Sequence, residues 1–279
     1  MKITKTCYEC LTQLVYQAAE MATDDENKRN RAVEKGLKKL RESFSLDKVS
    51  IVVATALHDT IKAESGSLDP YYKLKQSEIA LARTAYLKVQ DRYNGNFRGL
   101  LKLAALGNTL DFFRPLDVIE EDMKKEPEFV IDDTERLEAK IMEAKTMLYL
   151  ADNAGEMFFD LPLLKWMRQY ADVAYVVKER PVQNDLTRDE IRAAGLEGEF
   201  GWIMDTGTAT PGIDFEVASA EFKKAFAEAD LIFAKGMGYY ESLTEFPARG
   251  RVFHCLVAKC RPVADSIGVP LNSSIAMMR

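Results

Sequence analysis

The sequence has little of what several common classes of protein require. Histidine occurs only twice in 279 residues, at His58 and His254, which leaves little room for imidazole chemistry. No apolar run approaches the ~18 residues of a membrane span, and Met1 to Lys5 lack the apolar core of a secretory signal. With 44 acidic and 38 basic residues spread along it, the chain has no basic stripe for nucleic acid. We therefore expect a cytoplasmic protein whose partner is neither nucleic acid nor membrane.

Cysteine is also scarce, and its four copies lie in two close pairs, Cys7 with Cys10 and Cys255 with Cys260. So few and so clustered cysteines exclude the disulfide framework of a small secreted protein. Cys7 and Cys10 lie on the apolar stripe of the first predicted helix, which favours two small buried side chains. Two alternatives stay open: a structural zinc bound by all four thiolates if the chain ends meet, and a reversible disulfide in the C-x-x-C pair.

The first half of the chain, residues 1 to about 145, is predicted to be almost wholly helical. Apolar side chains recur at helical spacing in residues 7–21 and again in 33–44. After the segment 97–106, Gly107 to Asp111 reads Gly-Asn-Thr-Leu-Asp, and the simplest interpretation is a helix end capped by Asn108. The other expected helices are 47–66, a helix with Asp69 as N-cap and Pro70 at its first position that ends at Gly95, and 134–144.

From Thr146 onward the pattern changes to strand, loop and helix in alternation. This pattern predicts a Rossmann-like α/β domain over residues 146–279, with a parallel sheet between two helical layers. The helical region 1–145 would precede this domain, pack on it and partly cover its site. The expected strands are 147–151, 173–178, 202–204, 231–234 and 252–257.

Ligand-capable side chains follow every one of these strands. Because the carboxyl ends of parallel strands meet at one edge of a sheet, we expect these side chains to gather there. They are Asp152 with Asn153, Asn184 with Asp185, Asp205 with Thr206, Lys235 and Lys259.

The residue types at this edge suit a hard cation next to a phosphate. Asp152, Asn153 and Asp185 offer the oxygen ligands that Mg²⁺ or Mn²⁺ prefers. Gly155 allows a tight turn into a helix N-terminus that favours an anion, and Lys235 is followed by two glycines that let backbone donors approach a phosphoryl group. The simpler interpretations are a polar turn after a strand and a surface lysine.

Five motifs of the sequence form a recognisable set: DNAGE at 152–156, VVKERPVQND at 176–185, KGMGYYESL at 235–243, GNTLD at 107–111 and KCRPVA at 259–264. Together they resemble the metal-dependent damage-control phosphatases of the domain of unknown function 89 family, and the Cys7-x-x-Cys10 pair resembles its cysteine-bearing branch. Family members combine a helical N-terminal region with an α/β domain and hydrolyse small phosphorylated metabolites.

The resemblance implies a role for each matching residue. Asp152, Asn153 and Asp185 would bind a divalent metal, Mn, Ni, Mg or Co, and would act in catalysis together with Lys235, which would hold the phosphate. No organic cofactor is expected. Where family members commonly carry Asn, this chain has Tyr239. The residues expected to line the substrate site are Asn108, Asp111, Glu156, Gly236 and Lys259.

Two other functions fit parts of the pattern. A nucleotide- or S-adenosylmethionine-dependent transferase has a similar alternation of strands and helices, but here one glycine follows the first strand instead of a G-x-G-x-x-G turn. A non-catalytic helical module with a Cys-bound zinc is the second alternative. The sequence leaves open which phosphometabolite is the substrate, whether water or an Asp carboxylate is the nucleophile, and the oligomeric state.

Overall fold

A computed structural model of the chain describes residues 1–93, 95–109, 121 and 123–279. Within these residues the strands form one seven-stranded sheet in the order β1-β7-β6-β5-β2-β3-β4. All neighbouring strands run parallel except β6 and β7, which are antiparallel. The strands are β1 Phe129–Asp132, β2 Thr146–Leu150, β3 Asp172–Val177, β4 Ile203–Asp205, β5 Leu231–Lys235, β6 Val252–Val257 and β7 Ser274–Met278.

The predicted α/β class and all five predicted strands are confirmed, and two strands were missed. β1 lies within the half predicted to be helical. Its apolar run is only three residues long, and its residues are alternately half-buried and exposed. β7 follows α13 (Arg261–Ile267) closely, so the chain turns back and pairs antiparallel with β6 instead of crossing over. The sheet therefore extends beyond β6 and is only mostly parallel.

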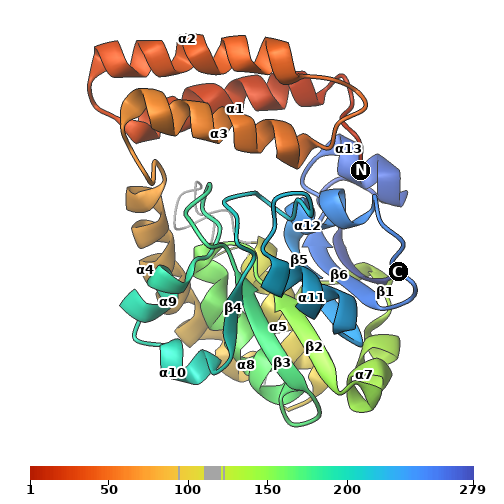
Figure 1. Ribbon diagram of the computed structural model, residues 1–279. Coiled ribbons are helices and arrows are strands. Elements are labelled where there is room, and N and C mark those ends of the chain that lie inside the picture. The colour runs from red at the N-terminus through yellow and green to blue at the C-terminus, as the bar shows by residue number, and fades with distance from the viewer. Residues whose placement is uncertain (94, 110–120, 122) are drawn as a thin grey trace.

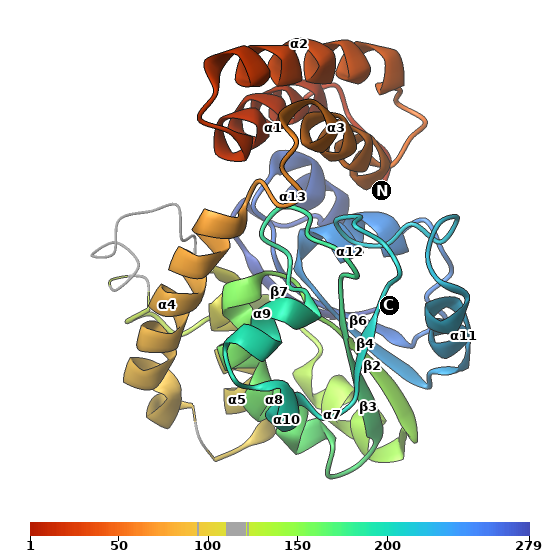
Figure 2. The same ribbon diagram turned by 60° about the vertical axis from the view of Figure 1, so that its left-hand side comes forward.

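Helices cover both faces of the sheet, and successive residues of β2 show why. Met147 and Tyr149 point to one face and join the core formed with α4 (Tyr72–Val89), α5 (Phe97–Thr109), α7 (Thr134–Glu143) and α8 (Met157–Met167). Leu148 and Leu150 point to the other face, toward α11 (Ala220–Glu228) and α12 (Gly236–Leu243). Figure 2 shows α4 and α11 on opposite sides of the strands. A strand buried on both faces reads as a continuous apolar run.

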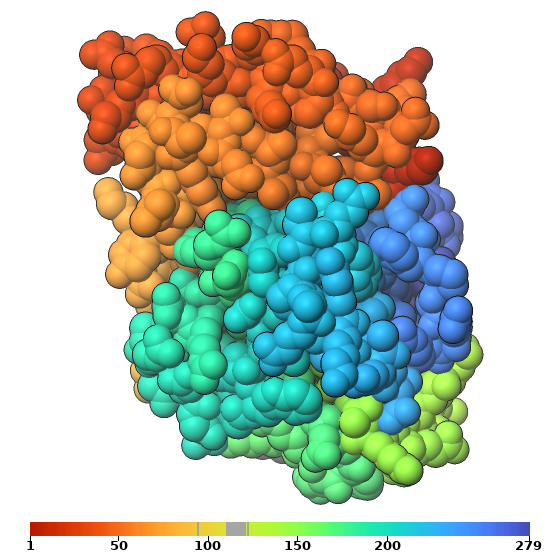
Figure 3. Space-filling view, viewed as in Figure 1, coloured from red at the N-terminus to blue at the C-terminus, as the bar shows by residue number. Residues whose placement is uncertain are grey.

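The first three helices form a layer of their own above the carboxyl ends of the strands (Figure 1). They are α1 Cys7–Ala22, α2 Glu26–Ser43 and α3 Ser50–Ser65, and we call them the three-helix unit. The unit has a separate apolar core, and α3 ends at Gly66 in the left-handed conformation. Figure 3 shows the unit, in orange, lying across the top of the α/β body.

Polar contacts fasten the three-helix unit to the α/β body. The amino group of Met1 lies 2.8 Å from a carboxylate oxygen of Glu245. Ser50, the first residue of α3, donates to Glu241 of α12, and Lys62 near the end of α3 donates to the backbone oxygen of Pro181. Among the helices that the structure describes, none is long and apolar enough to cross a membrane.

The helix after the three-helix unit begins later than predicted. α4 starts at Tyr72 instead of Pro70, because Asp69 accepts from the backbone of Tyr71 at 3.2 Å in a turn that precedes the helix. Its regular turns end at Val89, before a short 3₁₀ turn. The remaining short elements are η1 Gln90–Arg92, η2 Ala154–Glu156, α9 Arg188–Ala193 and α10 Glu197–Phe200.

Candidate active site

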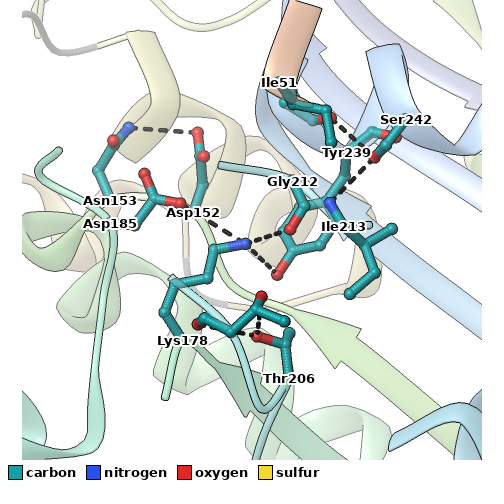
Figure 4. A network of polar contacts seen from close by, with 12 residues as sticks. Ile51, Asp152, Asn153, Lys178, Asp185, Thr206, Gly212, Ile213, Tyr239 and Ser242 are labelled. Atoms are coloured by element: carbon teal, nitrogen blue, oxygen red, sulfur yellow. Dashed lines mark hydrogen bonds and ion pairs between the residues drawn. The ribbon is translucent and has the colours of Figure 1, made fainter. Parts of the chain in front are cut away.

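Two neighbouring loops at the carboxyl edge of the sheet bring the predicted oxygen ligands together. The backbone oxygen of Asp152 accepts from Leu186 at 2.8 Å, and Ala154 donates to the backbone oxygen of Asn184 at 2.8 Å. Asn153 and Asp185 pair directly as an isolated β-bridge. Figure 4 shows the side chains of Asp152, Asn153 and Asp185 close to one another. The loop after β2 and the loop after β3 are thus joined through their backbones.

Helix α4 fixes the second of these loops from the side. Glu78 accepts from the amide of Asn184 at 3.0 Å. The fully buried ammonium of Lys75 lies 2.6 Å from Glu190 and 2.8 Å from Asp69. Glu190 in turn completes the capping box of α9. A buried ion pair that loses one partner is strongly destabilised, so these contacts hold the segment with Asp185 in place.

Asn108 does not cap its helix, so the interpretation from spacing alone was wrong, whereas the family resemblance had placed this residue among those that line the site. Its amide nitrogen donates to Asp152 at 2.8 Å and to Glu156 at 2.9 Å, and its oxygen accepts from the backbone of Val257 at 3.2 Å. The side chain is buried inside the last turn of α5. A buried amide with every partner in place fixes the Asp152 carboxylate from the helical side. Asp111, the other predicted residue of this motif, lies outside the described residues.

Gly107, the residue before Asn108, allows α5 to pack closely against α8. A Cβ atom at this position would lie 2.9 Å from the Cβ of Phe159 in α8. Such a distance is too short for two carbon atoms, so only glycine allows the helices to approach this closely.

Gly236 has a comparable role for Asp152 itself. The residue has φ +80°, and a Cβ there would lie 2.0 Å from a carboxylate oxygen of Asp152. Any side chain would therefore displace the carboxylate. The first glycine after Lys235 is needed for the approach of Asp152, a reason different from the predicted approach to a phosphate.

Lys235 lies at the end of β5, but its ammonium points into a buried cluster. It is 2.5 Å from Glu156 and pairs with Asp160, which also accepts from Tyr175 at 2.8 Å. Lys235, Glu156 and Asp160 are each 0–1% exposed. The ammonium holds the pKa of Glu156 below its usual value despite burial. The predicted contact of Lys235 with phosphate stays a prediction, because its ammonium already pairs with two carboxylates of the chain, those of Glu156 and Asp160.

The remaining predicted edge residues divide into two groups. Lys259, two residues after the end of β6, is exposed, and its charge acts on both Asp152 and Glu156. Asp205, the last residue of β4, and Thr206, which follows it, bond within the adjoining loop. Asp205 accepts from the backbone of Gly207 at 2.8 Å, and Thr206 contacts the Thr208 side chain at 3.2 Å.

Sequence reasoning missed Lys178, which follows β3. Its ammonium donates to the backbone oxygen of Gly212 at 2.6 Å and to the Tyr239 hydroxyl at 2.9 Å, and lies 3.5 Å from Asp185 (Figure 4). The criterion that singled out Lys235, a lysine directly after a buried strand, applies equally to Lys178.

The acids of the site repel one another. Burial, followed by the charges of Glu156 and Asp185, raises the pKa of Asp152 well above its usual value. Burial raises the pKa of Asp185 to about 6, although Lys178 opposes the shift. A divalent cation would stabilise the ionised form of both carboxylates, because they are buried and have too little positive charge beside them.

The donor set at this position fits a cation with open coordination positions. Across the described residues, no three His, Cys, Asp or Glu side chains form a ready-made metal-binding group. Asp152 and Asp185 supply two carboxylates, and Asn153 supplies an amide. The amide nitrogen of Asn153 donates to Glu156 at 2.7 Å, which leaves its oxygen as the remaining donor. Two carboxylates and one amide oxygen match the preference of Mg²⁺ and Mn²⁺ for hard ligands.

The cysteines are more exposed than the sequence suggested. Cys10 is exposed and Cys7 is half-buried, so the prediction of two buried side chains was wrong for Cys10. Cys260 lies close enough to Cys7 and Cys10 for their charges to raise the pKa of its thiol, after the larger effect of burial. Cys255, in contrast, is buried beside Lys235. Cys255 and Cys260 have different surroundings, which argues against one four-thiolate zinc site.

Comparison with known proteins gives a consistent result over the full length. The family model of the damage-control phosphatase ARMT1-like domain matches residues 3–275. Damage-control phosphatase PH1575 from Pyrococcus horikoshii is 34% identical, with 99% of this chain and 98% of that protein covered. A damage-control phosphatase from Archaeoglobus fulgidus is 33% identical, with 99% of both chains covered.

The similarity extends to three-dimensional structure. The crystal structure of the DUF89 family protein PH1575 matches with a TM-score of 0.92 at 31% identity, and the match covers 100% of this chain and 99% of that one. The resemblance seen in the sequence motifs is thereby confirmed. This chain belongs to the ARMT1-like, or DUF89, damage-control phosphatase family.

Proposed function

We propose that this chain is a metal-dependent phosphatase that hydrolyses monoesters of small phosphorylated metabolites. One observation carries the proposal: Asp152, Asn153 and Asp185, from two separate loops, converge at the carboxyl edge of the sheet, where the pKa values of both acids are raised. Family membership and the names of the relatives support the same reaction class.

In this proposal, Asp152, Asn153 and Asp185 hold a divalent cation, Mn, Ni, Mg or Co, that when bound polarises the phosphoryl group and offsets its charge. Asn108 orients Asp152 through its 2.8 Å hydrogen bond. Lys259, the exposed cation near Asp152 and Glu156, contacts the phosphoryl oxygens of the substrate. Lys235 acts indirectly, because it keeps Glu156 ionised and in position.

A nucleotide- or S-adenosylmethionine-dependent transferase is less well supported. Such enzymes bind the cofactor where a glycine-rich turn leaves room over the first strand end. Here Gly155 is buried in the 3₁₀ turn, and the side chains of Asn108, Asn153 and Glu156 bond to one another beside it. Polar side chains fill this turn, which favours a cation site over a dinucleotide site.

The test is a phosphate-release screen over sugar phosphates, nucleotides and other phosphometabolites, with and without Mn²⁺, Ni²⁺, Mg²⁺ and Co²⁺. We expect release only with added cation, and loss of at least about 99% of it in Asp152→Asn and Asp185→Asn, because each variant loses an anionic ligand. Asp205→Asn is the matched control, because Asp205 also lies at the carboxyl end of a strand but accepts only from the backbone of the adjoining loop, at Gly207. Full activity in either ligand variant at saturating cation would refute the assignment.

A further inference from the structure

The ammonium of Lys178 has three acceptors and is fully enclosed. Gly212 accepts at 2.6 Å and the Tyr239 hydroxyl at 2.9 Å, whereas Asp185 is at 3.5 Å, beyond a strong hydrogen bond. The ammonium also lies 4.1 Å from the centre of the Tyr239 ring. Lys178 and Tyr239 are each 1% exposed, so water does not replace a lost partner.

Tyr239 is held rigidly on the far side of this ammonium. It lies in α12, between Gly238 and Tyr240, and Gly238 packs so closely on Gly212 that a Cβ on Gly212 would be 2.2 Å from the Gly238 oxygen. Ser242, one turn further along α12, accepts from the backbone of Ile213 at 3.2 Å. The helix and the loop with Gly212 therefore form one support, which presents two oxygens to Lys178 (Figure 4).

This geometry bears on Asp185, which the proposed function assigns to the metal. An ammonium and a divalent cation compete for the same carboxylate, and each buried N–H donor needs an acceptor. Gly212 and the Tyr239 hydroxyl take two of the three N–H donors at hydrogen-bond distance, so only the third N–H is left for Asp185, at 3.5 Å. We propose that Tyr239 is a positioning residue that limits the contact between the Lys178 ammonium and Asp185, and so leaves this carboxylate available to a divalent cation. The inference rests on the proposed metal site.

Removal of the Tyr239 hydroxyl tests this role. In Tyr239→Phe the ring and its contact with Lys178 stay, but one N–H loses its acceptor, and the nearest remaining one is Asp185 at 3.5 Å. Measured by calorimetric titration of the metal-free protein with Mn²⁺ alone, the affinity should fall roughly ten- to hundredfold, the range for partners that orient metal ligands. Tyr240→Phe is the matched control, because its hydroxyl contacts Ser266 at 3.0 Å.

A double-mutant cycle shows whether the effect passes through Lys178. Lys178→Met removes the competing cation, so this variant should bind Mn²⁺ at least as tightly as wild type. Adding Tyr239→Phe to it should change the affinity less than about twofold, since no ammonium is left to misplace. Each variant must show a cooperative thermal transition, and Lys178→Gln replaces Lys178→Met if the latter does not fold.

Three results would overturn the inference: unchanged Mn²⁺ affinity in Tyr239→Phe, an equal loss of affinity with and without Lys178, or no Mn²⁺ binding by wild type. Failure of the proposed function would give a different result from failure of this inference. A wild-type protein that binds Mn²⁺ but releases phosphate from no monoester refutes the phosphatase assignment, while the comparison of Mn²⁺ affinities still decides the role of Tyr239.

Discussion

Single atoms decide whether Asp152 can occupy its position, and Gly236 is the sharpest case. Gly236→Ala and Gly268→Ala both place a side chain at positive φ, +80° and +82°, which costs about 1–2 kcal/mol of stability in each. At Gly236 the new Cβ would meet Asp152, whereas at Gly268 no atom of the described part of the chain lies within 4 Å of that position. We expect Gly236→Ala to lose Mn²⁺ binding and Gly268→Ala to keep it, as measured by titration calorimetry. Equal affinities in both variants would show that Asp152 does not need this space.

His254 predicts how stability depends on pH. Burial lowers its pKa to about 3 from 6.5, and neither ring nitrogen has a hydrogen-bond partner among the residues that the structure describes. Below about pH 6.5 the unfolded chain therefore binds a proton at His254, whereas the folded chain does not. The free energy of unfolding falls as the pH is lowered from about 6.5 toward 3. This residue contributes a slope of about 1.4 kcal/mol per pH unit in that window.

Urea unfolding of wild type and His254→Phe between pH 4 and 7 measures this contribution. The variant keeps an aromatic ring against Tyr240, whose ring centre is 5.3 Å away, and removes the titrating group. Its slope should be smaller by about 1.4 kcal/mol per pH unit. His58, whose pKa burial also lowers to about 3, continues to titrate in both proteins. Parallel curves would mean that His254 is protonated equally in the folded and unfolded states.

At the scale of elements, the buried ion cluster of Lys235, Glu156 and Asp160 joins β5 to the start of α8 and so stabilises the site. Lys235→Met leaves Glu156 and Asp160 buried without their shared cation, and removal of one partner from a buried pair costs roughly 3–5 kcal/mol. Urea unfolding at pH 7 should show this loss. Lys165→Met is the control, because its pair with Glu199 is about half exposed and should contribute less than about 1 kcal/mol. A stable Lys235→Met protein with weakened phosphate binding would restore the role predicted from sequence.

Elements with a strong periodic pattern were predictable, and short or unusually paired ones were not. β6 was predicted at its observed bounds, Val252–Val257, because this strand is buried along its whole length and is apolar except for His254. β1 and β7 were missed because their place depends on a partner strand that the local sequence does not specify. Spacing alone misread Asn108 for the same reason, because its partners, Asp152 and Val257, are 44 and 149 residues away.

The candidate site was predictable as far as parallel topology reaches. Asp152, Asn153 and Asp185 could be placed together because the carboxyl ends of neighbouring parallel strands meet. The direction of a long side chain could not be read in the same way. Lys178 and Lys235 both leave a strand at that edge, yet both ammonium groups turn into the protein. Lys178 donates to Gly212 and Tyr239, whereas Lys235 pairs with Glu156.

At the scale of the whole molecule, the three-helix unit reaches the loop that carries Asp185. Lys62 near the end of α3 donates to the backbone oxygen of Pro181, four residues before Asp185, and burial lowers the pKa of Lys62. We propose that the packing of the helical region on the α/β domain restrains this loop. Loss of the contact between Lys62 and Pro181 should then affect activity more than the stability of the fold.

Lys62→Met tests this coupling, because methionine keeps most of the apolar stem and removes the donor. We expect faster amide hydrogen exchange in residues 181–187 and a fall in kcat/KM of up to about a hundredfold, since small displacements of a ligand are costly. The melting temperature should change by no more than a few degrees, because the three-helix unit keeps its own core and the contacts of Met1 and Ser50. Lys38→Met, which breaks only a surface pair with Glu42 in α2, should leave all three measurements unchanged. Unchanged exchange in the loop of Lys62→Met would show that the three-helix unit does not restrain the Asp185 loop.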